Sequence, residues 1–193
     1  MKVAREELPA FAEGVLKKIQ PKTSGALLLF LLGQLGSGKT TFMQAFASAL
    51  GVEDTVQSPT FVLMKKYELP KNSKGPSLTP GLSKDGPPEF LGGRIPEATP
   101  LEPALRRRLK ESALSFKRLI HIDAYRLEDP HEFAALRPEE FLQDPQNIVC
   151  IEWAENISSA LPAPDLVLKF SSEGMGEGER EIEIYDSGFT NQE

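Results

Sequence analysis

The chain has 193 residues, a formal net charge of −6 and a pI of about 5.2. This length predicts a single domain over residues 1–193, and the acidic balance argues against a general nucleic-acid coat protein. The single cysteine, Cys150, excludes a disulfide framework. The N-terminal residues lack an apolar segment of signal-peptide length, and the longest apolar run is far short of the ~20 residues of a membrane span. We therefore expect a cytoplasmic protein with no membrane partner.

The first elements predicted are a helix, a strand, a turn and a second helix. Apolar residues recur at helical spacing over residues 5–19. Residues 27–32 are a short apolar run that stops at Gly33, as a strand buried on both faces does. Helix formers follow over residues 42–50, with Gly51 where a C-terminal glycine belongs. Strand, turn and helix in this order are the context that a phosphate-binding loop requires.

The turn matches the phosphate-loop pattern, in which Gly33 and four further residues precede Gly38, Lys39 and Thr40. Glycines let backbone N–H groups approach phosphate oxygens, and the helix N-terminus adds partial positive charge. Lys39 would bind the β- and γ-phosphates, and the Thr40 hydroxyl would ligate Mg²⁺. The sequence therefore predicts a site for a nucleoside triphosphate with Mg²⁺, formed by Gly33, Gln34, Leu35, Gly36, Ser37, Gly38, Lys39, Thr40 and Thr41.

A loop at residues 52–60 precedes a strand predicted over residues 61–67. Pro59 fixes its own φ and keeps Ser58 out of the helical region, so the loop has a defined shape. In phosphate-loop enzymes the connection after the first helix often senses the γ-phosphate. Thr60 or Ser58 would then offer a hydroxyl to Mg²⁺ or the γ-phosphate. Equally, Ser-Pro-Thr is ordinary turn chemistry at the start of a strand.

Residues 70–117 differ in composition from the rest of the chain. They hold eight of the sixteen prolines and carry a net charge of +4, so the remainder carries −10. We interpret the segment as a poorly ordered Pro/Gly-rich basic insertion that ends in a helix beginning near Thr99. The basic residues 106–110 on that helix are either a solvated face or a contact for a nucleic-acid phosphate backbone or an acidic partner.

Two further strands are predicted to end in carboxylates, at Asp123 after residues 118–122 and at Glu152 after residues 148–151. Because the carboxyl ends of parallel strands line the ligand crevice, Asp123 is a candidate Mg²⁺ ligand. Its alternative role is to cap the following turn. Glu152 is a candidate for organising Mg²⁺ or the attacking water. Trp153 either packs on a nucleotide or a partner, or closes the core, and we interpret His121 as a core or surface imidazole rather than a ligand.

The remaining elements complete an α/β fold. Pro138 separates two short helices over residues 129–142, and residues 166–170 and 181–185 predict two strands joined by a glycine-rich turn. The alternation of polar and apolar residues in the last strand is typical of a strand that pairs antiparallel with its neighbour. We expect a phosphate-loop NTPase fold, with a mixed, mostly parallel central sheet, helices on both faces and an antiparallel C-terminal hairpin.

Four motifs occur in an order that resembles the TsaE family, small bacterial ATPases of the tRNA N6-threonylcarbamoyladenosine pathway. They are residues 33–41, Ser58-Pro59-Thr60-Phe61, residues 121–127 followed by Asp129-Pro130, and Ile151-Glu152-Trp153. The resemblance implies an ATPase that acts with TsaD and TsaB in modifying position 37 of tRNA. It assigns phosphate and Mg²⁺ roles to Lys39 and Thr40, a switch role to Thr60, acidic roles to Asp123 and Glu152, and a place near the nucleotide to Trp153.

Gln34 departs from the family pattern, which usually has an acidic residue at this position. Two alternatives to a partner-stimulated ATPase therefore stay open. One is a small-molecule or nucleoside kinase, for which the helix with Arg106, Arg107 and Arg108 would act as a lid. The other is a nucleotide-gated binding module that does not hydrolyse its ligand.

Overall fold

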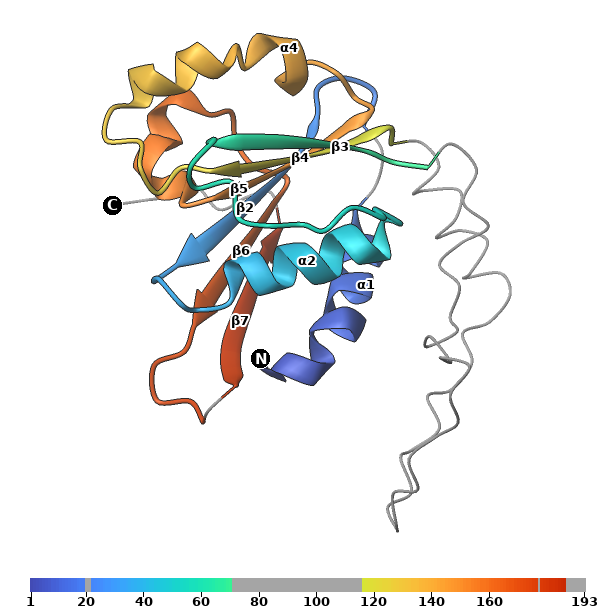
Figure 1. The fold of residues 1–193 in the computed structure, drawn as a ribbon, viewed down its shortest axis with the longest axis vertical. Coiled ribbons are helices and arrows are strands. Elements are labelled where there is room, and N and C mark those ends of the chain that lie inside the picture. Colours follow the sequence, from blue (N-terminus) through green and yellow to red (C-terminus); the bar gives the residue numbers. More distant parts are fainter. Residues whose placement is uncertain (20–21, 71–115, 177, 187–193) are drawn as a thin grey trace.

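The computed structural model describes residues 1–19, 22–70, 116–176 and 178–186, in which one seven-stranded sheet carries helices on both faces (Figure 1). The strands are β1 Lys2–Ala4, β2 Leu27–Gly33, β3 Met64–Glu68, β4 Arg118–Asp123, β5 Asn147–Glu152, β6 Leu166–Ser171 and β7 Glu179–Asp186. The α-helices are α1 Leu8–Lys18, α2 Lys39–Ala49 and α4 Glu139–Leu142, and the 3-10 helices are η1 Arg5–Glu7, η2 Pro130–Leu136 and η3 Ala154–Ala160.

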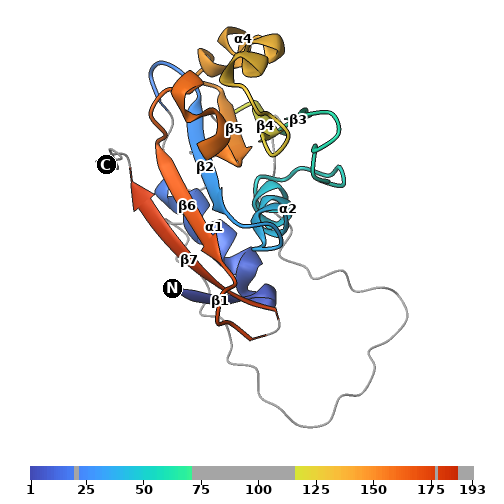
Figure 2. The same ribbon diagram turned by 90° about the vertical axis from the view of Figure 1, so that its left-hand side faces the viewer.

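The strands lie in the order β1-β7-β6-β2-β5-β4-β3, which Figure 2 shows from one edge to the other. The central strands β6, β2, β5 and β4 are parallel, whereas β1, β7 and β3 pair antiparallel with their neighbours. The expectation of a mixed sheet that is mostly parallel in its centre is therefore confirmed, and β1 and β3 are antiparallel strands at its two edges. The predicted C-terminal hairpin is confirmed, because β6 and β7 pair antiparallel in the register Val167–Tyr185.

Strand β2 is apolar throughout because both of its faces are covered. Leu27, Leu29 and Leu31 point into a core beneath α1 and α2, and Leu28 and Phe30 point into a second core on the opposite face. The second core also holds side chains from η2, α4 and η3. The sequence predicted helices on both faces, and the two cores confirm it.

Aromatic side chains fill the core between α2 and the sheet. The Phe42 ring is fully buried and lies 5.8 Å from the ring of Phe11 in α1, 5.6 Å from Phe46 and 5.6 Å from Phe170 in β6. Ring centroids at these distances are in favourable contact. Phe42 therefore joins both helices of this face to the sheet, and it fixes the start of α2.

Two expected elements differ from the structure. The strand predicted over residues 61–67 begins only at Met64, because the N–H groups of Val62 and Leu63 donate to Pro59 O at 2.8 and 2.6 Å and form a turn. Leu63 has a φ of 62°, which ends the turn in the left-handed region. Strand β1 was not predicted, since its three residues are too few to show alternation and depend on pairing with β7.

Most of the predicted insertion, residues 71–115, lies outside the described residues, as do its helix and the basic residues 106–110. Its two ends are adjacent, because Leu69 N donates to Lys117 O at 2.7 Å. The insertion therefore connects β3 to β4, which are antiparallel neighbours at the sheet edge. Among the residues that the structure describes, no helix has the length and apolar character of a membrane span.

Replacing Phe42 by Ala is expected to lower the free energy of unfolding by about 3–5 kcal/mol, because the change leaves a cavity where three rings meet. The measurement is a urea titration followed by far-ultraviolet circular dichroism. The matched control is Phe61→Ala, whose ring is 84% exposed, and which should change stability by less than about 0.5 kcal/mol. Equal losses in the two variants would contradict this view of the core.

Candidate functional site

The glycine-rich loop runs from the end of β2 to the start of α2. Gly33 has a φ of 129°, and a Cβ there would collide with Phe170 O in β6, so only glycine fits. Gly38 is the N-cap residue of α2 with a φ of 101°, and as a glycine it has no side chain to accept a hydrogen bond from the first turn of that helix. Uncapped N–H groups at a helix N-terminus form a binding site for anions.

Lys39, the first residue of α2, is buried against its own loop with only 4% of its surface exposed. Its ammonium donates to Gly33 O at 2.5 Å and Gln34 O at 2.9 Å, and Nζ lies 4.0 Å from the centre of the Trp153 ring. Burial lowers the pKa of Lys39, while the charges of Glu152, Glu155 and Asp123 act in the opposite direction. The charge thus lies in a site where an added anion would be poorly screened.

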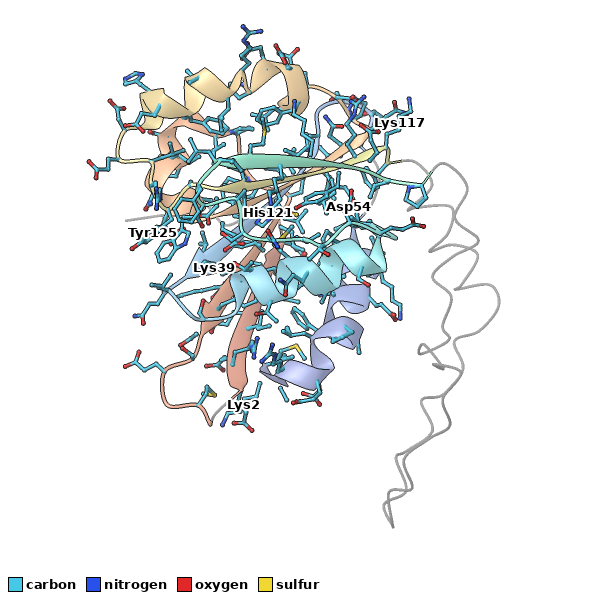
Figure 3. All side chains as sticks on the ribbon, in the orientation of Figure 1. Lys2, Lys39, Asp54, Lys117, His121 and Tyr125 are labelled. Carbon is cyan, nitrogen blue, oxygen red and sulfur yellow. The ribbon has the colours of Figure 1, made fainter. Side chains whose placement is uncertain are left out.

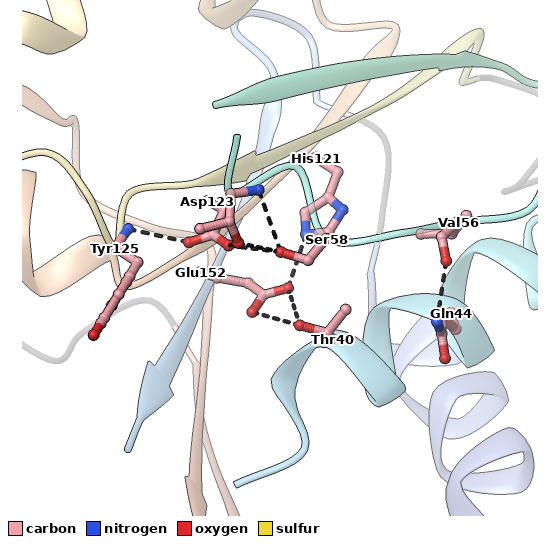
Figure 4. Close-up of polar contacts among 9 residues, drawn as sticks. Thr40, Gln44, Val56, Ser58, His121, Asp123, Tyr125 and Glu152 are labelled. Atoms are coloured by element: carbon pink, nitrogen blue, oxygen red, sulfur yellow. Dashed lines mark hydrogen bonds and ion pairs between the residues drawn. The ribbon is translucent and has the colours of Figure 1, made fainter. Parts of the chain in front are cut away.

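Glu152 ends β5 and joins α2 to the sheet through a buried hydrogen-bond chain (Figure 4). Thr40 Oγ1 lies 3.0 Å from both carboxylate oxygens of Glu152 and donates to them. His121 Nε2 lies 2.9 Å from Glu152 Oε1, with the imidazole fully buried. Because a carboxylate only accepts, Nε2 carries the proton and His121 fixes one oxygen of Glu152.

Asp123 ends β4 and collects three donors from two loops. The hydroxyls of Ser58 and Thr60 both donate to Asp123 Oδ2, from Ser58 at 2.8 Å. Tyr125 N donates to Asp123 Oδ1 at 3.0 Å. Asp123 therefore caps the following turn, which was one of the two roles considered for it. It also holds the loop of Ser58 and Thr60, whose hydroxyls were candidate ligands of Mg²⁺ or the γ-phosphate.

The sheet register explains why these side chains meet. Asp123 and Glu152 are direct partners in the parallel pair of β4 and β5, and Glu152 is paired with Leu31 of β2, two residues before the glycine-rich loop. Parallel strands end at one edge of a sheet, so residues far apart in sequence lie together there. In Figure 3, Lys39, His121 and Tyr125 gather at this end, whereas Lys2 and Lys117 lie far from it.

A pocket of about 340 Å³ lies between the loop and the two strand ends. Ten of the predicted site residues line it: Leu35, Gly36, Gly38, Lys39, Thr40, Thr41, Thr60, Asp123, Glu152 and Trp153. The other three do not line it. Gly33 and Gln34 accept hydrogen bonds from Lys39, and Ser37 is buried with no partner for its hydroxyl among the described residues.

Sequence reasoning missed the roles of two aromatic residues at this site. His121 was expected to be either a core or a surface imidazole; it is buried, and its contact with Glu152 was not foreseen. Its spacing of two residues from Asp123 was an available signal, since both side chains must lie on one face of the strand. Tyr125 also lines the pocket, with its ring 5.0 Å from that of Trp153.

Fold and site together define a class of α/β proteins, in which a glycine-rich turn after a parallel strand faces carboxylates from its neighbours across one pocket. Within that class the chain belongs to the TsaE family. The sequence profile of the family described as "Threonylcarbamoyl adenosine biosynthesis protein TsaE" matches residues 3–78 and 108–182.

Individual relatives agree with this assignment. Proteins named tRNA threonylcarbamoyladenosine biosynthesis protein TsaE are 30% identical over 155 residues in Bacillus subtilis and 27% identical over 171 residues in Aquifex aeolicus. These matches cover 80% and 88% of this chain, and 66% and 84% of the relatives, so the chain spans just under two thirds of the Bacillus protein. The crystal structure of Bacillus subtilis YdiB shares the fold, with a TM-score of 0.55 and 24% identity over 97% of this chain and 86% of that one.

His121→Leu is expected to lower the free energy of unfolding by about 1–3 kcal/mol, because it removes one of the two donors to a buried carboxylate oxygen of Glu152. The matched variant His121→Gln keeps an N–H donor at similar reach and should lose less. Urea titrations of both variants provide the comparison. A leucine variant as stable as the wild type would show that the imidazole does not support Glu152.

Proposed function

We propose that this protein is a Mg²⁺-dependent ATPase that serves the formation of N6-threonylcarbamoyladenosine at position 37 of tRNA, together with TsaD and TsaB. One observation carries the proposal: Lys39, Thr40, Asp123 and Glu152, which come from three separate parts of the chain, line one pocket at the N-terminus of α2. The names of the relatives support the pathway. ATP hydrolysis, Mg²⁺ binding and the two partners belong to the proposal.

The loop suits the phosphate chain of ATP. Gly38 leaves the backbone open to the pocket, and the uncapped first turn of α2 offers N–H donors. The ammonium of Lys39 is bound by carbonyls of its own loop, which phosphate oxygens could replace as acceptors. In this view Lys39 stabilises the charge that develops on the γ-phosphate.

The acidic side of the pocket suits Mg²⁺, which prefers oxygen ligands. The candidate ligands are the Thr40 hydroxyl and the carboxylate of Glu152, already in contact, with Asp123 in the same pocket. A bound Mg²⁺ would neutralise charge on the β- and γ-phosphates. Since Ser58 and Thr60 are bonded to Asp123, any ligand that engages Asp123 would also reorganise their loop.

The rim of this pocket supports a role for protein partners. Four of the five large apolar side chains exposed in the described residues lie there or directly beside it: Leu35, Phe61, Val62 and Tyr125. Phe61 and Val62 follow Thr60 in the loop that Asp123 holds. Exposed apolar groups gathered in one place mark protein interaction sites. We infer that TsaD and TsaB bind at this rim, and that hydrolysis by the isolated protein is slow.

Lys39→Met is expected to weaken binding of MgATP and to reduce phosphate release about 100-fold, because among the described residues Lys39 is the one cation that lines the pocket. Binding can be followed by the fluorescence of Trp153, the single tryptophan of the chain, whose ring lies under the Lys39 ammonium. The matched control is Lys17→Met, on the exposed face of α1. Wild-type protein that binds no ATP in the presence of Mg²⁺ would overturn the proposed function.

The same assay distinguishes the alternatives when ATP carries a labelled γ-phosphate. Label released as inorganic phosphate supports the ATPase, whereas label on an organic acceptor supports a kinase. Binding without turnover, with TsaD, TsaB and tRNA all present, supports a module that does not hydrolyse its ligand.

Phe61→Ala is expected to reduce the stimulation of phosphate release by TsaD and TsaB at least threefold, while the rate of the isolated protein stays unchanged. The reason is that the Phe61 ring is exposed on the rim and stacks only with Arg126, whose guanidinium carbon lies 4.4 Å from the ring centre. Phe61→Tyr keeps the ring and should keep the stimulation. Full stimulation of the alanine variant would place the partner contact elsewhere.

A further inference from the structure

Arg180 of β7 lies against the glycine-rich loop from the side opposite to the two carboxylates. Only 7% of its surface is exposed. A Cβ placed on Gly38 would lie 2.5 Å from Arg180 Nη1, so the guanidinium occupies the direction in which a side chain at Gly38 would point. Arg180 Nη2 donates to Gly178 O at 2.9 Å, which holds the side chain in place.

This guanidinium lacks a counter-charge among the described residues, in contrast to those of Arg118 and Arg137. Arg118 pairs with Glu68 at 2.9 Å and with Asp144 at 3.5 Å, and Arg137 pairs with Glu140 at 3.3 Å. For Arg180 no carboxylate of the described residues lies within ion-pair distance, and its Nε is buried without a hydrogen-bond partner. A buried cation without an anion is unfavourable unless a ligand supplies one.

The strand order shows which part of a ligand Arg180 would meet. Glu152 and Asp123 come from β5 and β4 on one side of β2, and Arg180 comes from β7 on the other side, beyond β6 (Figure 2). Gly38 lines the pocket and also contacts the guanidinium. A phosphate chain with its Mg²⁺ end at the carboxylates would therefore extend past Gly38 toward β7.

We propose that Arg180 is a phosphate-binding residue of this site, which contacts the phosphates nearest the nucleoside while Lys39 binds the terminal ones. The ligand class is a nucleoside diphosphate or triphosphate, and the inference rests on the function proposed above. A planar guanidinium with several N–H groups suits phosphate oxygens, and its position against Gly38 is fixed before a ligand arrives. Because ADP and ATP share their inner phosphates, Arg180 contributes to the binding of both.

A purely structural arginine would behave differently from a ligand-binding one. If Arg180 only supported the loop, its removal would destabilise the unligated protein. If Arg180 instead binds an anionic ligand, its replacement by an uncharged side chain of similar length removes a buried charge that has no counter-charge in the unligated protein. The unligated protein should then melt at the same or a higher temperature and bind its ligand less well.

The test compares Arg180→Met with wild type and with the control Arg118→Met, whose arginine is partly exposed and ion-paired away from the loop. Titrations with ADP, MgATP and inorganic tripolyphosphate are followed by Trp153 fluorescence, and melting is measured without ligand. We expect R180M to weaken ADP and MgATP by the same factor of at least 10, with an unchanged or raised melting temperature. If R180M binds ADP with an affinity within twofold of that of the wild type, the inference about Arg180 is overturned, whereas the proposed function is not.

Wild-type protein that binds none of the three probes overturns the proposed function as well. If R180M is unstable, the inference is tested instead by NMR of the wild-type protein. The Nε–H resonance of Arg180 is assigned as the one that is absent in R180K. Addition of ADP should shift this resonance, and a resonance that does not move overturns the inference.

Discussion

The site depends on the register of three parallel strands. Strand β5 lies between β2 and β4, so that Glu152 is level with Leu31 on one side and with Asp123 on the other. A slip of one residue in either pair would turn the strand-end side chains to the opposite face, and the loop after β2 would lose its carboxylates. The apolar side chains of β2, which fill cores on both faces, make such a slip unfavourable.

The polar groups of the pocket are already bonded to one another. Lys39 is bound to carbonyls of its loop, Thr40 to Glu152, and the two hydroxyls of the loop before β3 to Asp123. The nucleotide proposed above would have to replace these contacts, and such an exchange of hydrogen bonds changes the free energy little. The gain on binding must then come from charge: an anion beside a buried ammonium, a helix N-terminus and a buried guanidinium.

Charge is unevenly distributed around the glycine-rich loop of this protein. The whole chain carries −6, yet the glycine-rich loop is flanked by Lys39 on one side and Arg180 on the other. Because both side chains are buried, their charges are screened less than those of exposed side chains, so an anion beside them would interact with them strongly. The unfavourable burial of these cations is tolerable where an anion is bound, which links the stability of the loop to its occupancy.

The sequence by itself determined the elements that local chemistry encodes. The run from Leu27 into Gly33 predicted a buried strand and a turn, and residues 42–50 predicted the helix that the structure begins three residues earlier, at Lys39. Asp123 and Glu152 could be identified as strand-end carboxylates, because apolar strands before them mark their position. Spacing along the chain carries this information, and no contact between distant residues is needed to read it.

Only the tertiary structure decided which residues surround the loop. The contact of His121 with Glu152, and that of Arg180 with Gly38, depend on strand order and register, which arise from the packing of distant segments. The late start of β3 and the short β1 depend likewise on their partners, since three-residue strands and turns have no strong local signal. Strand pairing therefore determines which side chains lie next to the glycine-rich loop, because pairing between strands is a property of the whole fold.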